Sequence, residues 1–265
     1  MTDEQIPDIR SDVPHGARIW NYWLGGKDNY AADRAVGDAV LAAFPQTKAY
    51  AVESRRFLVR AVRHLAGEAG IRQFLDIGTG LPTMQNTHEV AQGIAPESRI
   101  VYVDNDPLVL AHARALLVNT TPEGVTTYID ADYRDPAKII AGARDVLDFT
   151  QPIAVLFMGV FGYLKEAADA RAVIAGIMDV VPSGSYMVLW DGTDTSEAVI
   201  AASKAQAEMG SPYELRTVAE IEGWFAGFEP VEPGIVTVTR WRPSLAPVGG
   251  EVVPIDAYGG VARKP

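Results

Sequence analysis

The sequence has no cysteine among its 265 residues. Disulfides, thiolate nucleophiles and zinc sites with cysteine ligands are therefore excluded, and we expect no metal site. Long apolar runs are also missing. The longest, over residues 153–164, is too short to cross a bilayer and is typical of a buried strand. The first residues lack the basic and apolar regions of a secretory signal peptide. We therefore expect a cytoplasmic protein that does not bind membranes.

Basic residues are also scarce, with 23 Lys and Arg against 34 Asp and Glu and a net charge of −11. Proteins that bind nucleic acids usually present a basic face, so this balance predicts no nucleic-acid partner. Four arginines crowd one segment: Arg55, Arg56, Arg60 and Arg63. At helical spacing the last three share a face, which we interpret as a solvated surface rather than as a binding patch.

The apolar pattern predicts helices before residue 71 and strands alternating with helices after it. A strongly aromatic segment over 17–30 precedes two helices, the second over 48–66. We expect strands at 71–76, 99–104, 125–129, 153–160 and 185–190, and between them helices at 82–93, after Asp106-Pro107, after Asp135-Pro136 and at 166–180. Strands that are apolar on both faces and separated by helices predict a parallel sheet covered on both sides.

The last quarter of the chain has a weaker pattern. It predicts a polar helix near 195–208 and a second helix that begins at Thr217, where Thr217-Val-Ala-Glu220 has the residues of a capping box. Residues 227–231 and 235–241 resemble a closing pair of strands. The tail over 243–265 is rich in proline and glycine, and we expect it to be mostly coil.

Acidic residues follow several of the predicted strands. In open parallel α/β sheets, ligands bind beyond the carboxyl ends of the strands. Asp76 ends the first strand and Asp104 the second, while Asp132-Tyr133, the segment 161–163 and Asp191 follow the next three. This edge of the sheet suits a ligand that has hydroxyls and a positive charge.

The loop after the first strand is the most informative. Gly78 and Gly80 permit a tight turn and the close approach of a ligand to the backbone. Asp76 would repel a pyrophosphate but can hold an ammonium group, and Asp104 stands where a carboxylate normally accepts the hydroxyls of a ribose. A nucleoside that carries an amino acid and no phosphate satisfies both demands.

These residues carry a resemblance to a known family. Asp76-x-Gly78-x-Gly80 followed by 101–107 resembles the cofactor signature of class I S-adenosylmethionine-dependent methyltransferases. The segments 17–30, 74–83, 86–92 and 101–107 together are similar to the actinobacterial S-adenosyl methyltransferase family, long carried as a domain of unknown function. The resemblance covers essentially the whole chain.

The resemblance implies a Rossmann-like α/β fold with a mostly parallel seven-stranded sheet, an antiparallel last strand and helices on both faces. We divide the chain into an N-terminal helical extension at 1–70, a methyltransferase domain at 71–242 and a C-terminal tail at 243–265 that packs on this domain. The implied cofactor is S-adenosylmethionine.

The resemblance also assigns the cofactor-binding residues. Asp76, Gly78, Thr79 and Gly80 would line the methionine end, Asp104 would hold the ribose, and Asn105, Asp132 and Tyr133 would flank the adenine. The alternatives are that Asp104 only caps a helix and that Asp132 only forms a turn with Arg134. Two positions depart from the wider pattern: Pro82 replaces a third glycine, and Gly162 stands where the family often has a histidine.

No residue stands out as a catalytic base. The candidates by position alone are His15, Tyr22, Asp28, Tyr163 and Asp191. Methyl transfer is an in-line displacement in which alignment supplies much of the acceleration, so a strong base is not required. His88, in the helix behind the glycine loop, is a further candidate for contact with the cofactor.

The aromatic segment has two interpretations. Trp20, Tyr22, Trp23 and Tyr30 either pack a helical layer or form a lid over the cofactor, with polar contacts from Asn21, Lys27, Asp28 and Asn29. We expect a methyltransferase that acts on a small-molecule acceptor. The alternatives are a protein that binds the cofactor without methyl transfer and, least favoured because of Asp76 and Pro82, a nicotinamide-dependent oxidoreductase.

Overall fold

The structure is a computed structural model that describes residues 10–82, 85–116, 118–243 and 253–265. Its sheet has the strand order β3-β2-β1-β4-β5-β8-β6, and β7 also pairs with β8. The strands are β1 (Gln73–Ile77), β2 (Arg99–Asp104), β3 (Val125–Asp130), β4 (Ala154–Met158), β5 (Tyr186–Gly192), β6 (Glu229–Pro230), β7 (Val236–Thr237) and β8 (Ala257–Arg263). Strands β1 to β5 are parallel, and β8 is antiparallel to β5. The predicted Rossmann-like fold class is confirmed.

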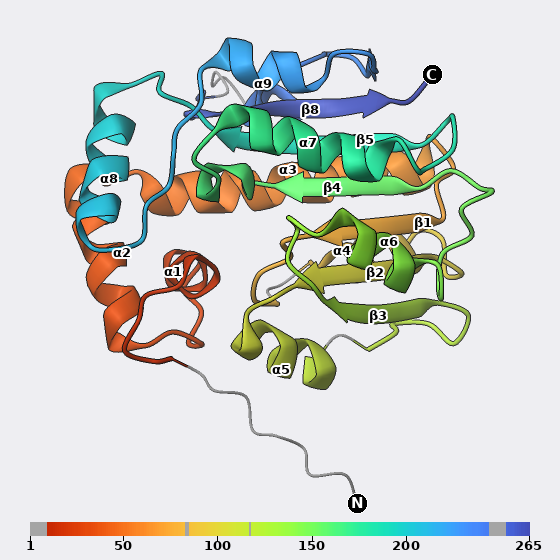
Figure 1. The fold of residues 1–265 in the computed structure, drawn as a ribbon, viewed down its shortest axis with the longest axis horizontal. Coiled ribbons are helices and arrows are strands. Elements are labelled where there is room, and N and C mark those ends of the chain that lie inside the picture. Colours follow the sequence, from red (N-terminus) through yellow and green to blue (C-terminus); the bar gives the residue numbers. More distant parts are fainter. Residues whose placement is uncertain (1–9, 83–84, 117, 244–252) are drawn as a thin grey trace, which may run out of the picture.

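Helices cover both faces of this sheet. They are α1 (Gly16–Trp23), α2 (Ala31–Ala43), α3 (Thr47–Gly67), α4 (Thr87–Gln92), α5 (Pro107–Leu116), α6 (Pro136–Ala143), α7 (Ala167–Met178), α8 (Glu197–Glu208) and α9 (Val218–Trp224). Figure 1 shows α6, α7 and α9 on one face and α3 on the other, while α1, α2 and α8 gather beyond the end at which β2 and β4 finish. No helix in the described ranges is long and apolar enough to cross a membrane.

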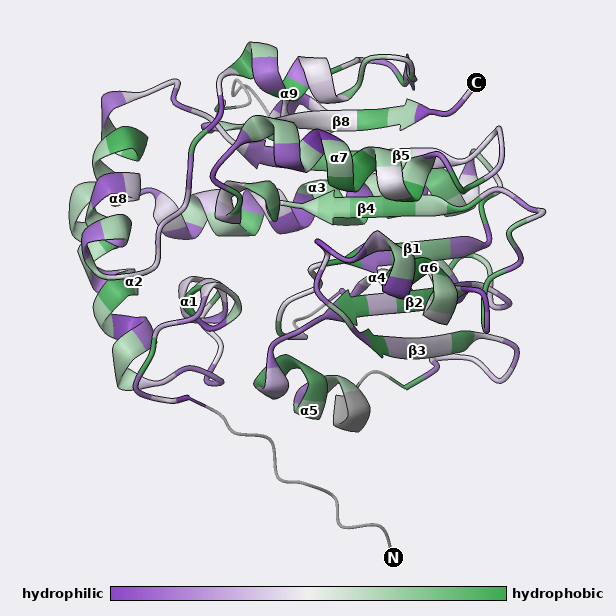
Figure 2. Cartoon of the chain, in the orientation of Figure 1, coloured by the Kyte–Doolittle hydropathy of each residue, from purple (hydrophilic) through white to green (hydrophobic). Residues whose placement is uncertain are grey.

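Alternation along the strands builds two core layers. On β2, Ile100 and Tyr102 belong to the layer under α3 and α4, whereas Val101 and Val103 belong to the layer under α6, α7 and α9. Strand β4 is hydrophobic along its whole length (Figure 2) because both of its faces are covered. The strand order reverses between β1 and β4, which opens a crevice at their carboxyl ends.

The prediction of mostly coil for the C-terminal tail missed the strand β8, and residues 244–252 of the tail lie outside the described residues. Strand β8 pairs with β5 over seven residues and lies inside the sheet. The predicted strand pair is also wrong in its partners, because β6 and β7 are two residues each and both pair with β8. A Cβ atom on Gly259 would lie 2.0 Å from the carbonyl oxygen of Leu189, so this strand needs glycine for close pairing. Its glycine content hid it from the apolar pattern.

Two further local predictions need correction. The helix predicted over 82–93 is the shorter α4. It begins with a capping box, in which the Glu89 carboxylate accepts the Asn86 N–H at 2.7 Å. Residues 83–84 lie outside the described residues. The arginine face of α3 is only partly solvated, because Arg60 donates to the Trp241 carbonyl at 2.8 Å. The domain boundaries stay a prediction.

Candidate functional site

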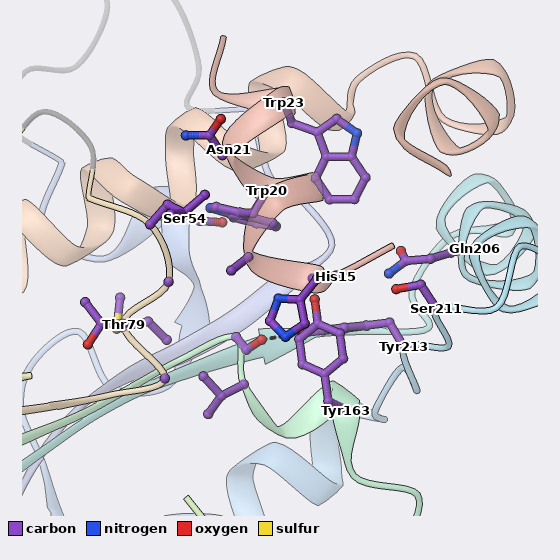
Figure 3. Close-up of a pocket in the computed structure, with 18 of the residues that line it drawn as sticks. His15, Trp20, Asn21, Trp23, Ser54, Thr79, Tyr163, Gln206, Ser211 and Tyr213 are labelled. Atoms are coloured by element: carbon purple, nitrogen blue, oxygen red, sulfur yellow. Dashed lines mark hydrogen bonds between the residues drawn. The ribbon is translucent and has the colours of Figure 1, made fainter. Parts of the chain in front are cut away.

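A cavity of about 480 Å³ lies at the crevice between β1 and β4. The ends of β1, β2, β4 and β5 form its floor, and residues of α1, α2, α3 and α8 and of the segments 131–134 and 211–215 line its sides (Figure 3). Such a volume is in the usual range of small-molecule sites.

The glycine loop after β1 lies on one side of the cavity. Gly78 and Gly80 both have a φ of +68°, which side chains rarely adopt. The Gly78 N–H donates to the Val103 carbonyl at 2.8 Å, and a Cβ atom on Gly78 would lie 2.4 Å from Cγ1 of Val160. The loop therefore presses against the ends of β2 and β4 and presents bare backbone to the cavity.

Asp104 stands at the end of β2 and lines the cavity. Its Oδ2 accepts the Gly80 N–H at 2.8 Å, and its Oδ1 accepts the N–H groups of Asn105 and Asp106. Burial raises the pKa of this carboxyl above its ordinary value. Helix α5 is capped instead by Asp106, which accepts the Leu108 N–H at 2.7 Å. Asp104 therefore braces the glycine loop rather than capping the helix.

Asp76 is the second buried carboxylate of the cavity wall. It accepts a hydrogen bond from the Thr87 hydroxyl at 2.6 Å. Burial raises the pKa of Asp76 to about 6, and the Thr87 hydrogen bond and the nearby Arg55 charge oppose this rise. Arg55 itself lines the cavity and donates to Oδ1 of Asn86 at 2.9 Å.

The residues predicted to flank an adenine separate into two groups. Asn105 and Tyr133 line the cavity, as does Arg134. Asp132 is not in the wall; it pairs with the Arg134 guanidinium at 2.7 Å and also accepts the Arg134 N–H at 2.8 Å. This is the turn that the alternative interpretation describes.

The five candidate bases also separate. His15 and Tyr163 line the cavity, whereas Tyr22, Asp28 and Asp191 do not. The Tyr22 hydroxyl donates to Asp38 at 2.6 Å on the surface, and Asp28 lies 3.6 Å from Nε2 of His112.

His15 sits at the start of α1, above the glycine loop. Its Nδ1 lies 3.0 Å from Oδ2 of Asp106, and its backbone N–H donates to the fully buried Asp33 at 2.9 Å. The carboxylate stands on the Nδ1 side of the ring, and among the described residues Nε2 has no protein partner. The pair is thus built like an oriented base at the cavity wall.

Tyr213 occupies the space left by Gly162. A Cβ atom on Gly162 would lie 2.2 Å from the Tyr213 ring, so no larger residue fits there with this ring in place. The Tyr213 hydroxyl donates to Asp191, which is fully buried behind it and also accepts the Phe161 N–H at 2.9 Å. Burial raises the pKa of Asp191 to about 6, although these donors oppose it. Asp191 therefore positions Tyr213 in the wall.

The aromatic segment serves both as packing and as part of the cavity wall. Trp20 and Trp23 line the cavity, and Trp20 packs on Trp190 with ring centroids 5.9 Å apart. Asn21 lines it too, but its Oδ1 accepts the Asp28 N–H at 3.1 Å and so folds the segment on itself. His88 lies outside the wall, with Nδ1 2.9 Å from the Tyr102 hydroxyl.

Several wall residues carry no motif and were not singled out from the sequence. They are Tyr50, Trp190, Gln206, Ser211 and Tyr213. They come from α3, β5, α8 and the segment after α8, so only the tertiary structure brings them together. One signal was available: the inward stripe of α8 reads Val199, Ala202 and Gln206, and a glutamine there breaks an apolar pattern.

Comparison with known proteins shows which family this chain resembles. Residues 2–265 match the family model described as S-adenosyl methyltransferase. A DUF574 family protein from Streptomyces avermitilis is 45% identical, with 97% of this chain and 100% of that chain covered and a TM-score of 0.92. A protein from Thermobifida fusca is 40% identical over 99% of each chain, with a TM-score of 0.89.

More distant structures share the fold alone. Human N-acetylserotonin methyltransferase, solved with S-adenosylmethionine, is 12% identical and has a TM-score of 0.51 over 97% of this chain and 64% of that chain. No curated protein matches the chain. The family match covers almost every residue, including the glycine loop and both buried carboxylates, and the chain belongs to the S-adenosyl methyltransferase family.

Proposed function

We propose that the chain transfers a methyl group from S-adenosylmethionine to a small-molecule acceptor. The observation that carries this proposal is the pair of buried carboxylates, Asp76 and Asp104, on either side of a bare glycine loop in one cavity. S-adenosylmethionine supplies an electrophilic methyl carbon on a sulfonium. The cavity continues past the loop, which leaves room for a second molecule.

The residues present fit this cofactor. Asp76 suits an ammonium group and disfavours a phosphate, which argues against a dinucleotide. Asp104 retains acceptor capacity on a buried carboxylate that faces the loop, which suits the hydroxyls of a ribose. Gly78, Thr79 and Gly80 offer close backbone approach, and we propose that Asn105 and Tyr133 flank the adenine.

His15 is the candidate that best suits removal of a proton from the acceptor. Ala17, two residues on, lies over Gly80 and would be 3.9 Å from a Cβ atom there, while Gly16 abuts the Tyr163 hydroxyl. The first turn of α1 therefore crosses the glycine loop between β4 and β2. This places the His15 ring next to the loop, with Asp106 behind it. The acidic net charge further favours a small acceptor over a nucleic acid.

Calorimetric titration with S-adenosylmethionine and S-adenosylhomocysteine, with NAD as the control, tests the cofactor. Binding of the two adenosyl ligands and none of NAD is expected. Release of S-adenosylhomocysteine in the presence of acceptors then tests turnover, and His15→Asn should slow turnover by about a hundredfold or more while leaving cofactor affinity unchanged. Binding without release across a broad set of acceptors would support the alternative, a cofactor-binding protein that transfers no methyl group.

A further inference from the structure

The cavity has two ends of different chemistry. We propose that the end between α2, α3 and α8 is the acceptor subsite and selects an uncharged, flat aromatic compound, whose neutral polar group binds Gln206 and Ser211. The acceptor hydroxyl that receives the methyl group faces His15. This inference rests on the proposed function and names the class of acceptor.

Charge is distributed unequally between the two ends. The carboxylate, guanidinium and imidazole groups of the wall all lie near the glycine loop or the strands beside it: His15, Arg55, Asp76, Asp104 and Arg134. The side chains that line the other end from α2, α8 and the segment 211–215 carry no charge. A charged acceptor seated there would lose its hydration without meeting a wall side chain of opposite charge, so we expect this end to disfavour ions.

Aromatic rings dominate the wall of the uncharged end. Trp20, Tyr50 and Trp190 pack against one another with ring centroids 5.9–6.1 Å apart. Tyr163 and Tyr213 meet edge to face at 5.1 Å on the side nearer His15. Aromatic surfaces of this kind favour a flat aromatic ligand, which can stack on one ring and meet the edge of another.

Gln206 and Ser211 are among the polar side chains of this wall that have no protein partner in the described residues. Gln206 is 6% exposed and Ser211 is 8% exposed, yet within the described part of the chain neither the Gln206 amide nor the Ser211 hydroxyl has a hydrogen-bond partner. Figure 3 shows both pointing into the cavity from α8 and the loop that follows it. Both groups reach the cavity, so a ligand there can pair with them in place of water.

Other hydroxyls of the same wall are already used. Ser203 donates to the Tyr213 carbonyl at 2.7 Å and Ser54 to the Tyr50 carbonyl at 2.9 Å. The contrast separates Gln206 and Ser211 from residues whose polar groups serve the fold. A neutral group such as a carbonyl or hydroxyl matches an amide and a hydroxyl, which together offer both donors and acceptors.

The transfer step follows from this placement. The acceptor hydroxyl gives its proton to Nε2 of His15, and its oxygen forms a bond to the methyl carbon. The carbon–sulfur bond breaks, and its electron pair remains on the sulfur. The products are a methyl ether, a protonated His15 and S-adenosylhomocysteine.

The test measures binding of single-ring probes to protein saturated with S-adenosylhomocysteine. The probes are 4-hydroxyacetophenone, 4-ethylphenol without the carbonyl, anionic 4-hydroxybenzoate, cationic tyramine and the non-aromatic 4-acetylcyclohexanol. We expect 4-hydroxyacetophenone to bind about two- to tenfold more tightly than 4-ethylphenol, the net effect of one hydrogen bond. It should bind at least about tenfold more tightly than 4-hydroxybenzoate and tyramine, and also more tightly than 4-acetylcyclohexanol.

Variants of α8 test whether Gln206 causes the preference for the carbonyl-bearing probe. Gln206→Leu should remove the advantage of 4-hydroxyacetophenone over 4-ethylphenol, and Gln206→Glu should shift preference towards tyramine. Lys204→Leu, on the exposed side of the same helix, is the control and should change neither ratio. Equal binding of the ions, no binding of any probe, or a carbonyl preference that survives Gln206→Leu would overturn the inference. Failure of S-adenosylhomocysteine itself to bind would instead overturn the proposed function.

Discussion

Replacement of Asp104 by asparagine tests the central assignment of the site. The amide oxygen can still accept the N–H groups of Asn105 and Asp106, so the end of β2 keeps its shape. The amide nitrogen then faces the Gly80 N–H, and the acceptor predicted for the ribose hydroxyls is lost. The substitution therefore removes the negative charge, the acceptor for the ribose and the hydrogen bond from Gly80, while keeping those from Asn105 and Asp106.

The expected size of the effect follows from the kind of hydrogen bond that is lost. Hydrogen bonds to a charged group contribute about 1.5–3 kcal/mol. Since about 1.4 kcal/mol corresponds to a tenfold change in affinity, S-adenosylmethionine should bind roughly ten- to a hundredfold more weakly to Asp104→Asn. Calorimetric titration gives the dissociation constant, and thermal unfolding shows whether the variant is folded.

A neighbouring aspartate supplies the control. Asp130 ends β3, is the register partner of Asp104 and is exposed outside the cavity wall. Asp130→Asn makes the same chemical change one strand away and should leave affinity unchanged. An unchanged dissociation constant in folded Asp104→Asn, or an equal loss in Asp130→Asn, would refute the ribose assignment.

Three further outcomes are expected. Because burial raises the pKa of Asp76 to about 6, the carboxyl becomes neutral below that pH and cannot pair with an ammonium, so cofactor affinity should fall by up to about tenfold per pH unit as the pH drops through this range. Titrations across the range should lose this slope in Asp76→Asn, and a slope that persists would assign it to another group. Gly162→Ala should lower the free energy of unfolding by about 1–3 kcal/mol in urea denaturation because its Cβ atom overlaps the Tyr213 ring. Gly67→Ala, whose Cβ atom would meet its nearest neighbour at 3.8 Å, should show no such loss. Thr217→Ala removes the side-chain cap of α9 and should cost about 1 kcal/mol by the same measurement, whereas no change would mean that the capping box contributes nothing.

Much of the fold could be predicted from local sequence. Strands β1, β2, β4 and β5 are short, mostly apolar runs, and Pro107 and Pro136 mark where α5 and α6 begin. The positions of these elements therefore follow from residues near in the chain. The strand in the C-terminal tail was not predicted because it depends on residues far away in the chain. Strand β8 owes its existence to pairing with β5. Gly259 allows the close approach to β5, and Gly260 allows the close approach of the Gly234 carbonyl.

The cofactor half of the cavity was predictable from the chain. In a parallel sheet, carboxyl ends of neighbouring strands meet at one edge, so Asp76, the glycine loop and Asp104 had to lie together once their strands were recognised. What the sequence did not determine is the other half. The Tyr213 ring packs over Gly162, and His15 contacts Asp106, so each pair joins segments far apart in the chain. Gln206 faces the same cavity from α8. Only tertiary packing decides which of these side chains meet in the cavity.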